Sequence, residues 1–308
     1  MYVYYYSLAG LSSDLAVMRV IRVLSSGWRR NSLVPFYNGS YLETNLSGLV
    51  KPLLNGVLMD SVAAYDAIAE WYDQQIRAGG LIHDLALPTL YALVGDVDGK
   101  SICDLACGQG IVARYLAARG ARVTGVDLSV RLLAIAQREE EAQPLGINYL
   151  SGDAQRLDTI HDASFDGVVC NMALMDIPDL MATARTVARI LRLGGWFVFA
   201  ITHPVLDTAM GRSGVTRGRD GQGDLQVRTY FAEGPWRSDN PDGVRGKVAA
   251  HHRTVSTYVN TLIATGLQIE QLAEPQPTGA FAARHTHFHD VPGILVVRCT
   301  KRLENIAS

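Results

Sequence analysis

The sequence has few cysteines and no long uncharged hydrophobic run. Only four of its 308 residues are Cys. No two of them form a CxxC pair, which excludes a disulfide framework and a cysteine zinc site. The uncharged stretch from Met1 to Ser13 is too short to cross a membrane. No basic residues precede its apolar part, as they would in a signal peptide. We therefore expect a cytoplasmic protein with no membrane partner and no bound metal.

The sequence also lacks an excess of charge of one sign. It carries 28 Lys and Arg against 30 Asp and Glu, for a formal net charge of −2. Proteins that bind nucleic acid through its phosphates present clustered cations, so nucleic acid is not an expected partner. A content of 48% hydrophobic and 19% charged residues is typical of a globular chain with a large core.

The chain divides into an N-terminal extension and one large domain. Residues 1–59 mix aromatic residues with Ser, Gly and Asn. They are interpreted either as a helical cap over the main domain or as a contact with a second copy of the chain in a homo-oligomer. Residues 60–301 form the domain, opened by an amphipathic helix over residues 60–76. Residues 204–247 are a lid-like insertion after the fifth strand, and residues 302–308 are a C-terminal tail.

Short β-rich runs alternate with helical patterns from residue 101 onward. The expected strands are 101–106, 121–127, 147–151, 165–171, 196–202, 267–273 and 293–300. The expected helices are 110–119, 129–141, 178–193 and 248–265. This alternation predicts an α/β fold, a Rossmann-like doubly wound sheet of seven mostly parallel strands with an antiparallel last strand.

The most informative segment is Asp104-Leu-Ala-Cys-Gly108-Gln-Gly110-Ile-Val-Ala113, between an expected strand and an expected helix. Its two glycines let the backbone bend tightly and approach a ligand. The start of the helix presents free N–H groups. Asp127 ends the next strand, where a carboxylate can accept both hydroxyls of a ribose. The segment therefore predicts a site for a nucleoside or a nucleotide.

Two cofactors fit this segment. Gly108-x-Gly110-x-x-Ala113 with Asp127 also matches the dinucleotide fingerprint, so an NAD(P)-dependent oxidoreductase is an alternative. Asp104 favours S-adenosylmethionine (SAM), because its carboxylate would repel a pyrophosphate but attract an ammonium and a sulfonium. Gly152-Asp153-Ala154 adds an acid that can accept from the adenine amino group. A non-catalytic SAM-binding or scaffolding protein remains a third interpretation.

Four motifs in this order resemble those of class I SAM-dependent methyltransferases that act on small molecules. They are Asp104-Leu-Ala-Cys-Gly-Gln-Gly110, Gly125-Val-Asp127-Leu-Ser129, Gly152-Asp153-Ala154 and Phe165-Asp-Gly-Val-Val-Cys-Asn171. Upstream, Tyr65-Asp-x-Ile-Ala-Glu-x-Tyr72-Asp73 resembles the entrance helix of that family. One departure is Ala106, where many members have Gly.

The resemblance implies a cofactor role for each matched residue. At the methionyl end, Asp104 would bind the ammonium and Asn171 would lie beside the methionyl group. The loop beneath it would be shaped by Ala106, Gly108 and Gly110. At the adenosyl end the residues are Asp127 for the ribose, Leu128 against the adenine, Asp153 for its amino group and Ala154 for its ring. Tyr65 and Tyr72 would close over the cofactor.

Methyl transfer from a sulfonium is an in-line displacement, so alignment is the protein's main task. A base is needed only for an acceptor that loses a proton. The acceptor is expected beyond the carboxyl ends of the fourth and fifth strands. Candidate bases are His203, Asp176, and His251 and His252 at the start of the expected 248–265 helix. The alternatives are a structural histidine braced by Pro204, a helix cap for Asp176 and a surface histidine pair.

The insertion offers side chains for the acceptor. Tyr230, Phe231 and Trp236 are expected to line an apolar acceptor pocket. His285, His287 and His289 alternate and would share one face of an extended segment. No acidic or Cys partner accompanies them closely, so we expect a polar loop rather than a metal site. The expected activity is methyl transfer from SAM to O, N or C of a small organic acceptor, giving S-adenosylhomocysteine (SAH).

Overall fold

The computed structural model describes residues 65–206, 215–217, 223–225, 227, 229–284 and 290–302. All of them belong to the second of two units into which the chain divides, Pro52–Ser308. The predicted extension 1–59, His285, His287 and His289, and nearly all of the predicted tail lie outside the described residues. Within those residues, no helix is long and apolar enough to cross a membrane.

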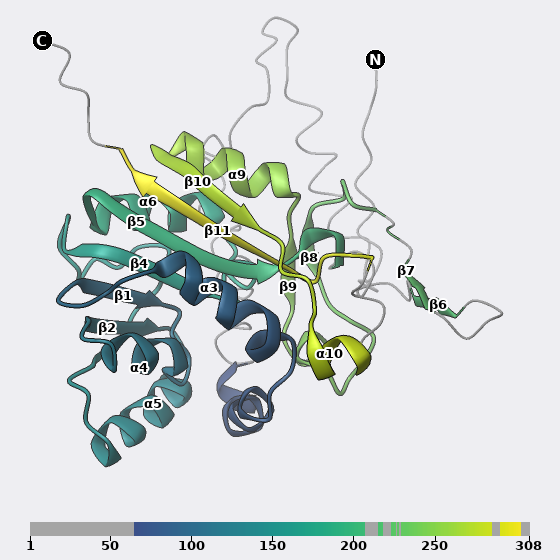
Figure 1. Ribbon diagram of the computed structural model, residues 1–308, viewed down its shortest axis with the longest axis horizontal. Helices are drawn as coiled ribbons and strands as arrows, with labels where there is room; N and C mark the ends of the chain where they lie inside the picture. The colour runs from purple at the N-terminus through teal and green to yellow at the C-terminus, as the bar shows by residue number, and fades with distance from the viewer. Residues whose placement is uncertain are drawn as a thin grey trace, which may run out of the picture. The chain divides into compact units, whose positions relative to one another are not determined.

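Seven strands form one sheet in the order β10-β11-β5-β4-β1-β2-β3 (Figure 1). They are β1 Ser101–Leu105, β2 Arg122–Asp127, β3 Asn148–Ser151, β4 Phe165–Asn171, β5 Leu191–Thr202, β10 Leu267–Ala273 and β11 Ile294–Lys301. Strands β1 to β5 are parallel to one another. Strand β11 is antiparallel to both β5 and β10. The predicted fold class is confirmed.

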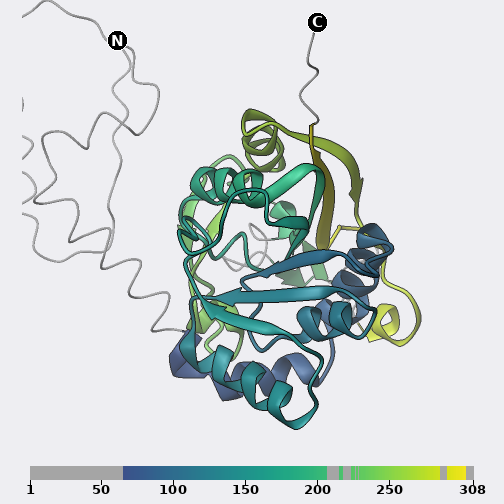
Figure 2. The ribbon, with the colours of Figure 1, turned by 90° about the vertical axis from the view of Figure 1, so that its left-hand side faces the viewer.

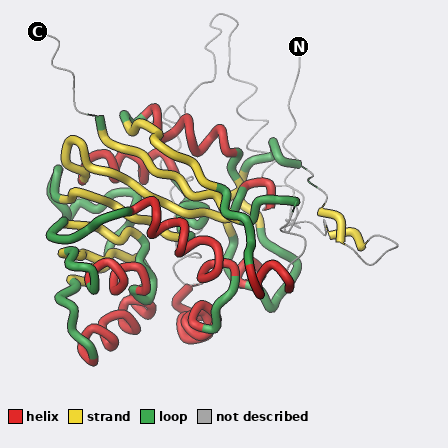
Figure 3. The backbone as a smooth tube through the Cα atoms, in the orientation of Figure 1, coloured by secondary structure: helices red, strands yellow, loops and turns green. Residues whose placement is uncertain are grey.

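Helices cover both faces of this sheet (Figures 2 and 3). They are residues 65–77, the π-helix η1 Ile82–Ala86, α3 Leu87–Val94, α4 Ile111–Ala117, α5 Val130–Ala142, α6 Leu180–Ile190, α8 Val244–Lys247, α9 Val255–Ala264 and α10 Gly279–Arg284. One buried cluster lies under α3, α4 and α5, and the other lies under α6 and α9. The central strands are thus buried on both sides, as expected for a parallel sheet.

The order of the strands reverses between β1 and β4. From β1 the chain proceeds outward to β2 and β3, then returns to β4 on the other side of β1 and continues to β5. The helices after β1 and β4 therefore lie on opposite faces, and a crevice is left at the carboxyl ends of these two strands. Ligands of open α/β sheets bind at such a reversal.

Two helix boundaries differ from the prediction for a local reason. Helix α6 begins at Leu180 rather than Pro178, because the Asp179 side chain accepts a hydrogen bond from Ala182 N and caps it. Asp176 is therefore not a helix cap. The expected helix 248–265 is instead β9 Ala250–His252 followed by α9, with Thr254 as its cap.

Strand β9 exists because the insertion supplies its partner. Strand β8, Gly234–Trp236, pairs antiparallel with β9. The Glu233 carboxylate accepts from Thr254 N at 2.8 Å and holds the start of α9 in place. His251 and His252 therefore lie on a strand and not at a helix start. The described remainder of the insertion contains the hairpin of β6 Val215–Arg217 and β7 Gly223–Leu225, and α8.

Candidate functional site

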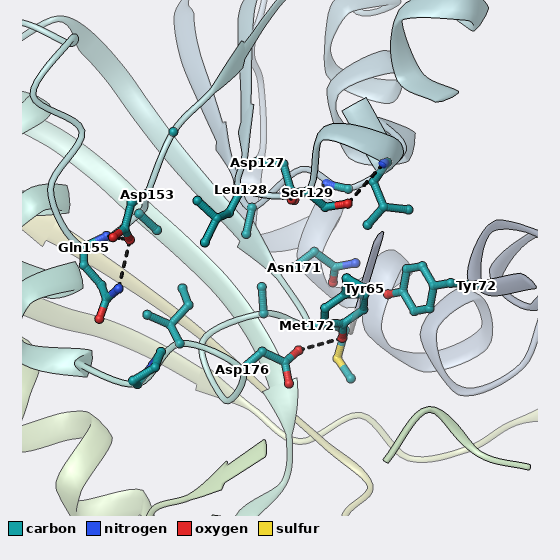
Figure 4. A pocket seen from close by; sticks show the side chains of 18 residues that line it. Tyr65, Tyr72, Asp127, Leu128, Ser129, Asp153, Gln155, Asn171, Met172 and Asp176 are labelled. Atoms are coloured by element: carbon teal, nitrogen blue, oxygen red, sulfur yellow. Dashed lines mark hydrogen bonds between the residues drawn. The ribbon is translucent and has the colours of Figure 1, made fainter. Parts of the chain in front are cut away.

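An outer pocket lies at the carboxyl edge of the sheet, beyond the ends of β1 to β4 (Figure 4). Helix 65–77 and the loop between β4 and α6 complete its wall. The predicted cofactor residues that line it are Tyr65, Tyr72, Ala106, Gly108, Asp127, Leu128, Asp153, Ala154 and Asn171. These residues are spread over more than a hundred positions of sequence, and the fold brings them to one pocket.

An inner cavity adjoins the outer pocket. The two share Tyr72, Ala106, Gly108 and Asn171. The inner cavity also reaches Asp104 and Gln109, and its apolar wall includes Ile82 of η1 and Leu87 of α3. Asp104 and Gln109 are 1% and 4% exposed, so only a small ligand group that enters this cavity can reach them.

Three buried polar atoms of the inner cavity have no hydrogen-bond partner among the residues that the structure describes: Asp104 Oδ2, Asn171 Oδ1 and Gln109 Nε2. A buried polar group without a partner costs about 1–3 kcal/mol, so three around one cavity indicate a polar ligand. Burial raises the pKa of Asp104 to about 8, against a lowering by the backbone N–H of Ala113. Two oxygens and one amide N–H match the ammonium and the carboxylate of an amino acid.

The Asp127 carboxylate joins two loops of the outer pocket. It accepts from Gly108 N and from Ser129 N, both at 2.7 Å. Burial raises its pKa, and these backbone donors lower it. A carboxylate can accept about four hydrogen bonds. Acceptor capacity thus remains on this carboxylate for a ligand hydroxyl.

The adenine end of the predicted site is built around Asp153. Its Oδ1 atom accepts from Gln155 N and Gln155 Nε2, both at 2.9 Å. Leu128 and Ala154 supply apolar surface to the same pocket. Gln155 lines the pocket too, and sequence reasoning missed it although it directly follows the matched Gly152-Asp153-Ala154 motif.

Gly108 and Gly110 serve different purposes. Both have positive φ, 54° and 85°. A Cβ on Gly110 would lie 2.3 Å from the Tyr149 hydroxyl, whereas on Gly108 it would meet only Leu132 Cδ1 at 3.9 Å. Gly108 lines both cavities, and Gly110 lines neither of them. Gly110 therefore lets the loop pack on β3, and Gly108 leaves room for a ligand.

Replacing each glycine by alanine separates these roles. Both substitutions place a side chain at left-handed φ, a cost of about 1–2 kcal/mol, but only Gly110→Ala adds the clash with Tyr149. We expect Gly110→Ala to lower the melting temperature more, with partial recovery in the double variant with Tyr149→Phe. We expect Gly108→Ala to weaken SAH binding more than its loss of stability accounts for. Equal melting temperatures of the two single variants would contradict this division.

Two further residues at the pocket have strained backbones. Ala106 and Met172 follow β1 and β4 with φ of 55° and 56°. Non-glycine residues at such angles occur mainly where a site demands them. The angle at Ala106 also accounts for the glycine that many members of the resembled family have there.

The four candidate bases do not gather at one place. Asp176 lines the outer pocket, and His203, His251 and His252 do not. His203 Nδ1 accepts from Val205 N, and its Nε2 lies 2.9 Å from Glu274 Oε1. Both ring nitrogens are thus engaged, and burial lowers the pKa of this histidine while Glu274 raises it. The geometry does not support His203 as a base, because the turn that follows β5 directs Val205 N–H onto its ring.

The two neighbouring histidines brace other segments. His252 Nε2 donates to Tyr230 O at 2.8 Å. The backbone N–H of His251 donates to Met175 O at 2.7 Å. Burial, with a contribution from Arg253, lowers the pKa of the His251 imidazole. Strand β9 is therefore hydrogen-bonded to the β4–α6 loop.

The aromatic residues expected in an acceptor pocket lie elsewhere. Phe231 is 89% exposed. Trp236 packs against the buried cluster under α6 and α9. The Tyr230 hydroxyl accepts from Val255 N. None of the three lines the outer pocket, because the β8–β9 pairing fixes this part of the insertion against the core.

The β4–α6 loop is held by a buried arginine that sequence reasoning missed. The Arg253 guanidinium donates to the carbonyls of Leu174, Ile177 and Pro178 at 3.0, 2.7 and 2.7 Å. Arg253 itself is 8% exposed. Because Asp176 lies within this loop, its position depends on these bonds. The sequence carries no signal for them, since Arg253 follows the loop by more than seventy residues.

Comparison with known proteins agrees with this site. The family model described as a methyltransferase domain matches residues 103–199. The crystal structure of an S-adenosylmethionine-dependent methyltransferase from Mesorhizobium loti is 33% identical and matches with a TM-score of 0.60. That match covers 69% of this chain and 96% of that chain. A SAM-dependent methyltransferase structure from Methanosarcina mazei shares the fold, with a TM-score of 0.53 and 20% identity. That match covers 70% of this chain and 98% of that chain.

A curated relative matches over a shorter stretch. The ubiquinone biosynthesis O-methyltransferase of Alkalilimnicola ehrlichii is 32% identical over 142 residues, which are 45% of this chain and 58% of that protein. The match thus spans less than two thirds of that relative's length. The Mesorhizobium loti enzyme, in contrast, is matched over nearly its whole length. The chain therefore belongs to the family of SAM-dependent methyltransferases.

Proposed function

We propose that this protein transfers the methyl group of SAM to an oxygen atom of a small organic acceptor. The observation that carries the proposal is the set of unpartnered buried atoms of Asp104, Asn171 and Gln109 in the inner cavity. An ammonium and a carboxylate at the end of the ligand would satisfy all three. Oxygen as the acceptor atom is supported by the curated relatives, which are named O-methyltransferases.

The charges of the site distinguish SAM from a dinucleotide. Asp127 and Asp153 line the outer pocket, and its described lining includes no Lys or Arg. A pyrophosphate placed among these carboxylates would be repelled, whereas a sulfonium and an ammonium would be attracted. The residues present therefore fit SAM and do not fit NAD(P), the alternative left open by the glycine pattern.

In this proposal each end of the cofactor has its own residues. Asp127 holds the two ribose hydroxyls, with Leu128 and Ala154 against the adenine and Asp153 near its amino group. Asp104 and Asn171 accept from the ammonium, and Gln109 donates to the carboxylate. When bound, SAM supplies a methyl carbon on a sulfonium, which is already activated. The protein contributes alignment and exclusion of water, for which rigid walls suffice.

Isothermal titration calorimetry tests the cofactor. We expect SAH to bind at least about 100-fold more tightly than NADH, since the latter would forfeit charge-assisted bonds of about 1.5–3 kcal/mol each. Transfer of radiolabelled methyl from SAM to a panel of phenols, amines and carboxylic acids tests the activity. Tight NADH binding without SAH binding would reverse the assignment. SAH binding with no transfer to any acceptor would instead favour a scaffolding protein.

A further inference from the structure

Three segments far apart in the chain meet at the carboxylate of Asp176. Tyr65 comes from helix 65–77, Asp176 from the β4–α6 loop and Arg245 from α8 in the insertion. The Tyr65 hydroxyl donates to Asp176 Oδ2 at 3.0 Å (Figure 4). The Arg245 guanidinium bonds Oδ1 through Nη1, and its Nη2 lies 3.5 Å from Oδ2. The cofactor assignment uses neither Asp176 nor Arg245.

The cluster pairs a permanent cation with an acidic side chain. The side chains of Arg245 and Asp176 are 17% and 13% exposed, so their ion pair is largely shielded from solvent. Burial first, and then the Asp176 charge, raises the pKa of the Tyr65 hydroxyl. Tyr65 therefore stays a donor, and Asp176 remains an acceptor with capacity for one more hydrogen bond.

The position of Asp176 relative to the cofactor residues is equally specific. In the cofactor assignment, the ribosyl and methionyl parts of SAM join where the two cavities meet. The residues shared by both cavities are Ala106, Gly108, Asn171 and Tyr72. Tyr65, Met172 and Asp176 lie together on another side of the outer pocket, away from Asp153 and Gln155 (Figure 4). The cofactor assignment gives no role to Met172 and Asp176 in this part of the wall.

We propose that Tyr65, Asp176 and Arg245 form the acceptor subsite, and that Asp176 accepts the proton of an uncharged hydroxyl acceptor. The proposal rests on the proposed function. An acceptor oxygen forms a bond to the methyl carbon while the carbon–sulfur bond breaks, and that electron pair returns to sulfur to leave neutral SAH. The hydroxyl proton passes to the Asp176 carboxylate and from there to solvent.

The same cluster selects against charged acceptors. A carboxylic acid acceptor is an anion at neutral pH and would be repelled by the Asp176 carboxylate, whose partners Tyr65 and Arg245 already donate to it. A protonated amine has no lone pair to attack with, and Arg245 already balances the charge that would otherwise attract it. An uncharged hydroxyl both donates a hydrogen bond to Asp176 and keeps a lone pair on oxygen. The apolar side chains of Met172 and Ile177 in the same wall suit a ring or chain that carries the hydroxyl.

The test uses Asp176→Asn with substituted phenols whose own pKa values run from about 7 to about 10. For the least acidic phenols we expect kcat/KM to fall at least about 100-fold, the usual contribution of a general base. The loss should shrink for phenols already ionised at the assay pH, because these need no base. SAH affinity should stay within about twofold of wild type. Asp179→Asn is the matched control, since it makes the same change on the same loop and Asn caps helices equally well.

Arg245 and Tyr65 act through Asp176 and are tested as positioning residues. Arg245→Gln removes the guanidinium that orients the Asp176 carboxylate, so kcat/KM should fall more for protonated than for ionised phenols. Arg245→Lys should restore part of this loss. Tyr65→Phe should lower kcat/KM for phenols that are protonated at the assay pH more than for phenols that are already ionised.

The outcomes distinguish a failure of the acceptor subsite from a failure of the proposed methyltransferase function. Wild-type kcat/KM in Asp176→Asn for phenols of every pKa would overturn the acceptor subsite and leave the methyltransferase intact. Transfer to amines or carboxylic acids but not to phenols would also overturn it. Absence of transfer to every acceptor class would be a failure of the proposed function itself.

Discussion

Replacing Asp127 with alanine is expected to weaken SAH binding at least tenfold and to reduce the thermal stabilisation that a given concentration of SAH gives. The carboxylate already accepts from the backbone N–H groups of Gly108 and Ser129 at 2.7 Å, and Asp127 lines the outer pocket, where its remaining acceptor capacity can serve a ligand. Each charge-assisted bond to a ribose hydroxyl contributes about 1.5–3 kcal/mol, so the loss of one accounts for the tenfold limit. Calorimetric titration with SAH measures the change.

Asp127→Asn is the informative companion variant. Its amide keeps one acceptor oxygen but turns a donor toward either Gly108 N or Ser129 N, so an intermediate affinity is expected. Asp162→Ala is the control for a lost carboxylate, because Asp162 is 77% exposed and pairs only with Arg189 on the surface. Undiminished affinity in Asp127→Ala would place the ribose elsewhere and remove the basis of the cofactor assignment.

The sheet and the cofactor wall could be predicted because their signals are local. Strand β10 and the Ser129 cap of α5 lie where the sequence predicts them, since periodicity and capping depend on neighbouring residues. The same holds for Asp104, Gly108 and Asp127, because in a parallel sheet each strand end is followed directly by its contribution to the site.

The acceptor side could not be predicted, because its contacts join distant segments. Nothing near Arg245 in the sequence indicates that it reaches Asp176, and the pairing of β8 with β9 replaces a helix that the local pattern favours. His203 shows where a local signal left two interpretations open, a base and a structural histidine. Its place at the end of β5 suggested a base, yet one hydrogen bond from Val205 N removes the free nitrogen that a base needs.

SAH binding is expected to release about one proton per complex at pH near 6.5. Burial raises the pKa of Asp104 to about 8, so the empty site holds this carboxyl protonated at that pH, while a ligand α-ammonium needs it ionised. Affinity should rise with pH up to about 8. Above this, the α-amino group of the ligand, with an ordinary pKa near 8, loses its own proton. Calorimetry in two buffers of different ionisation enthalpy counts the protons released.

Two controls assign that proton to Asp104. The ligand 5′-methylthioadenosine lacks the amino acid portion and should bind without releasing it. Asp104→Asn should bind SAH without proton release and with affinity lowered by about 100-fold, since the buried pairing of carboxylate and ammonium is lost. Binding of SAH to wild type with no proton uptake or release at pH near 6.5 would mean that Asp104 does not meet the ammonium.

Asp104→Asn should also change the stability of the ligand-free protein, in the opposite direction to its effect on binding. A carboxyl whose pKa is about 8 in the folded state and near 4 in the unfolded state binds more protons when folded. Its contribution to stability therefore falls as pH rises from about 4 to about 8. Asparagine has no such proton, so the melting temperature of Asp104→Asn relative to wild type should increase between pH 5 and pH 8.5. If Asp104→Asn becomes more stable relative to wild type as pH rises but binds SAH more weakly, Asp104 lowers the stability of the folded protein at neutral pH. The protein then keeps this carboxylate because cofactor binding needs its charge.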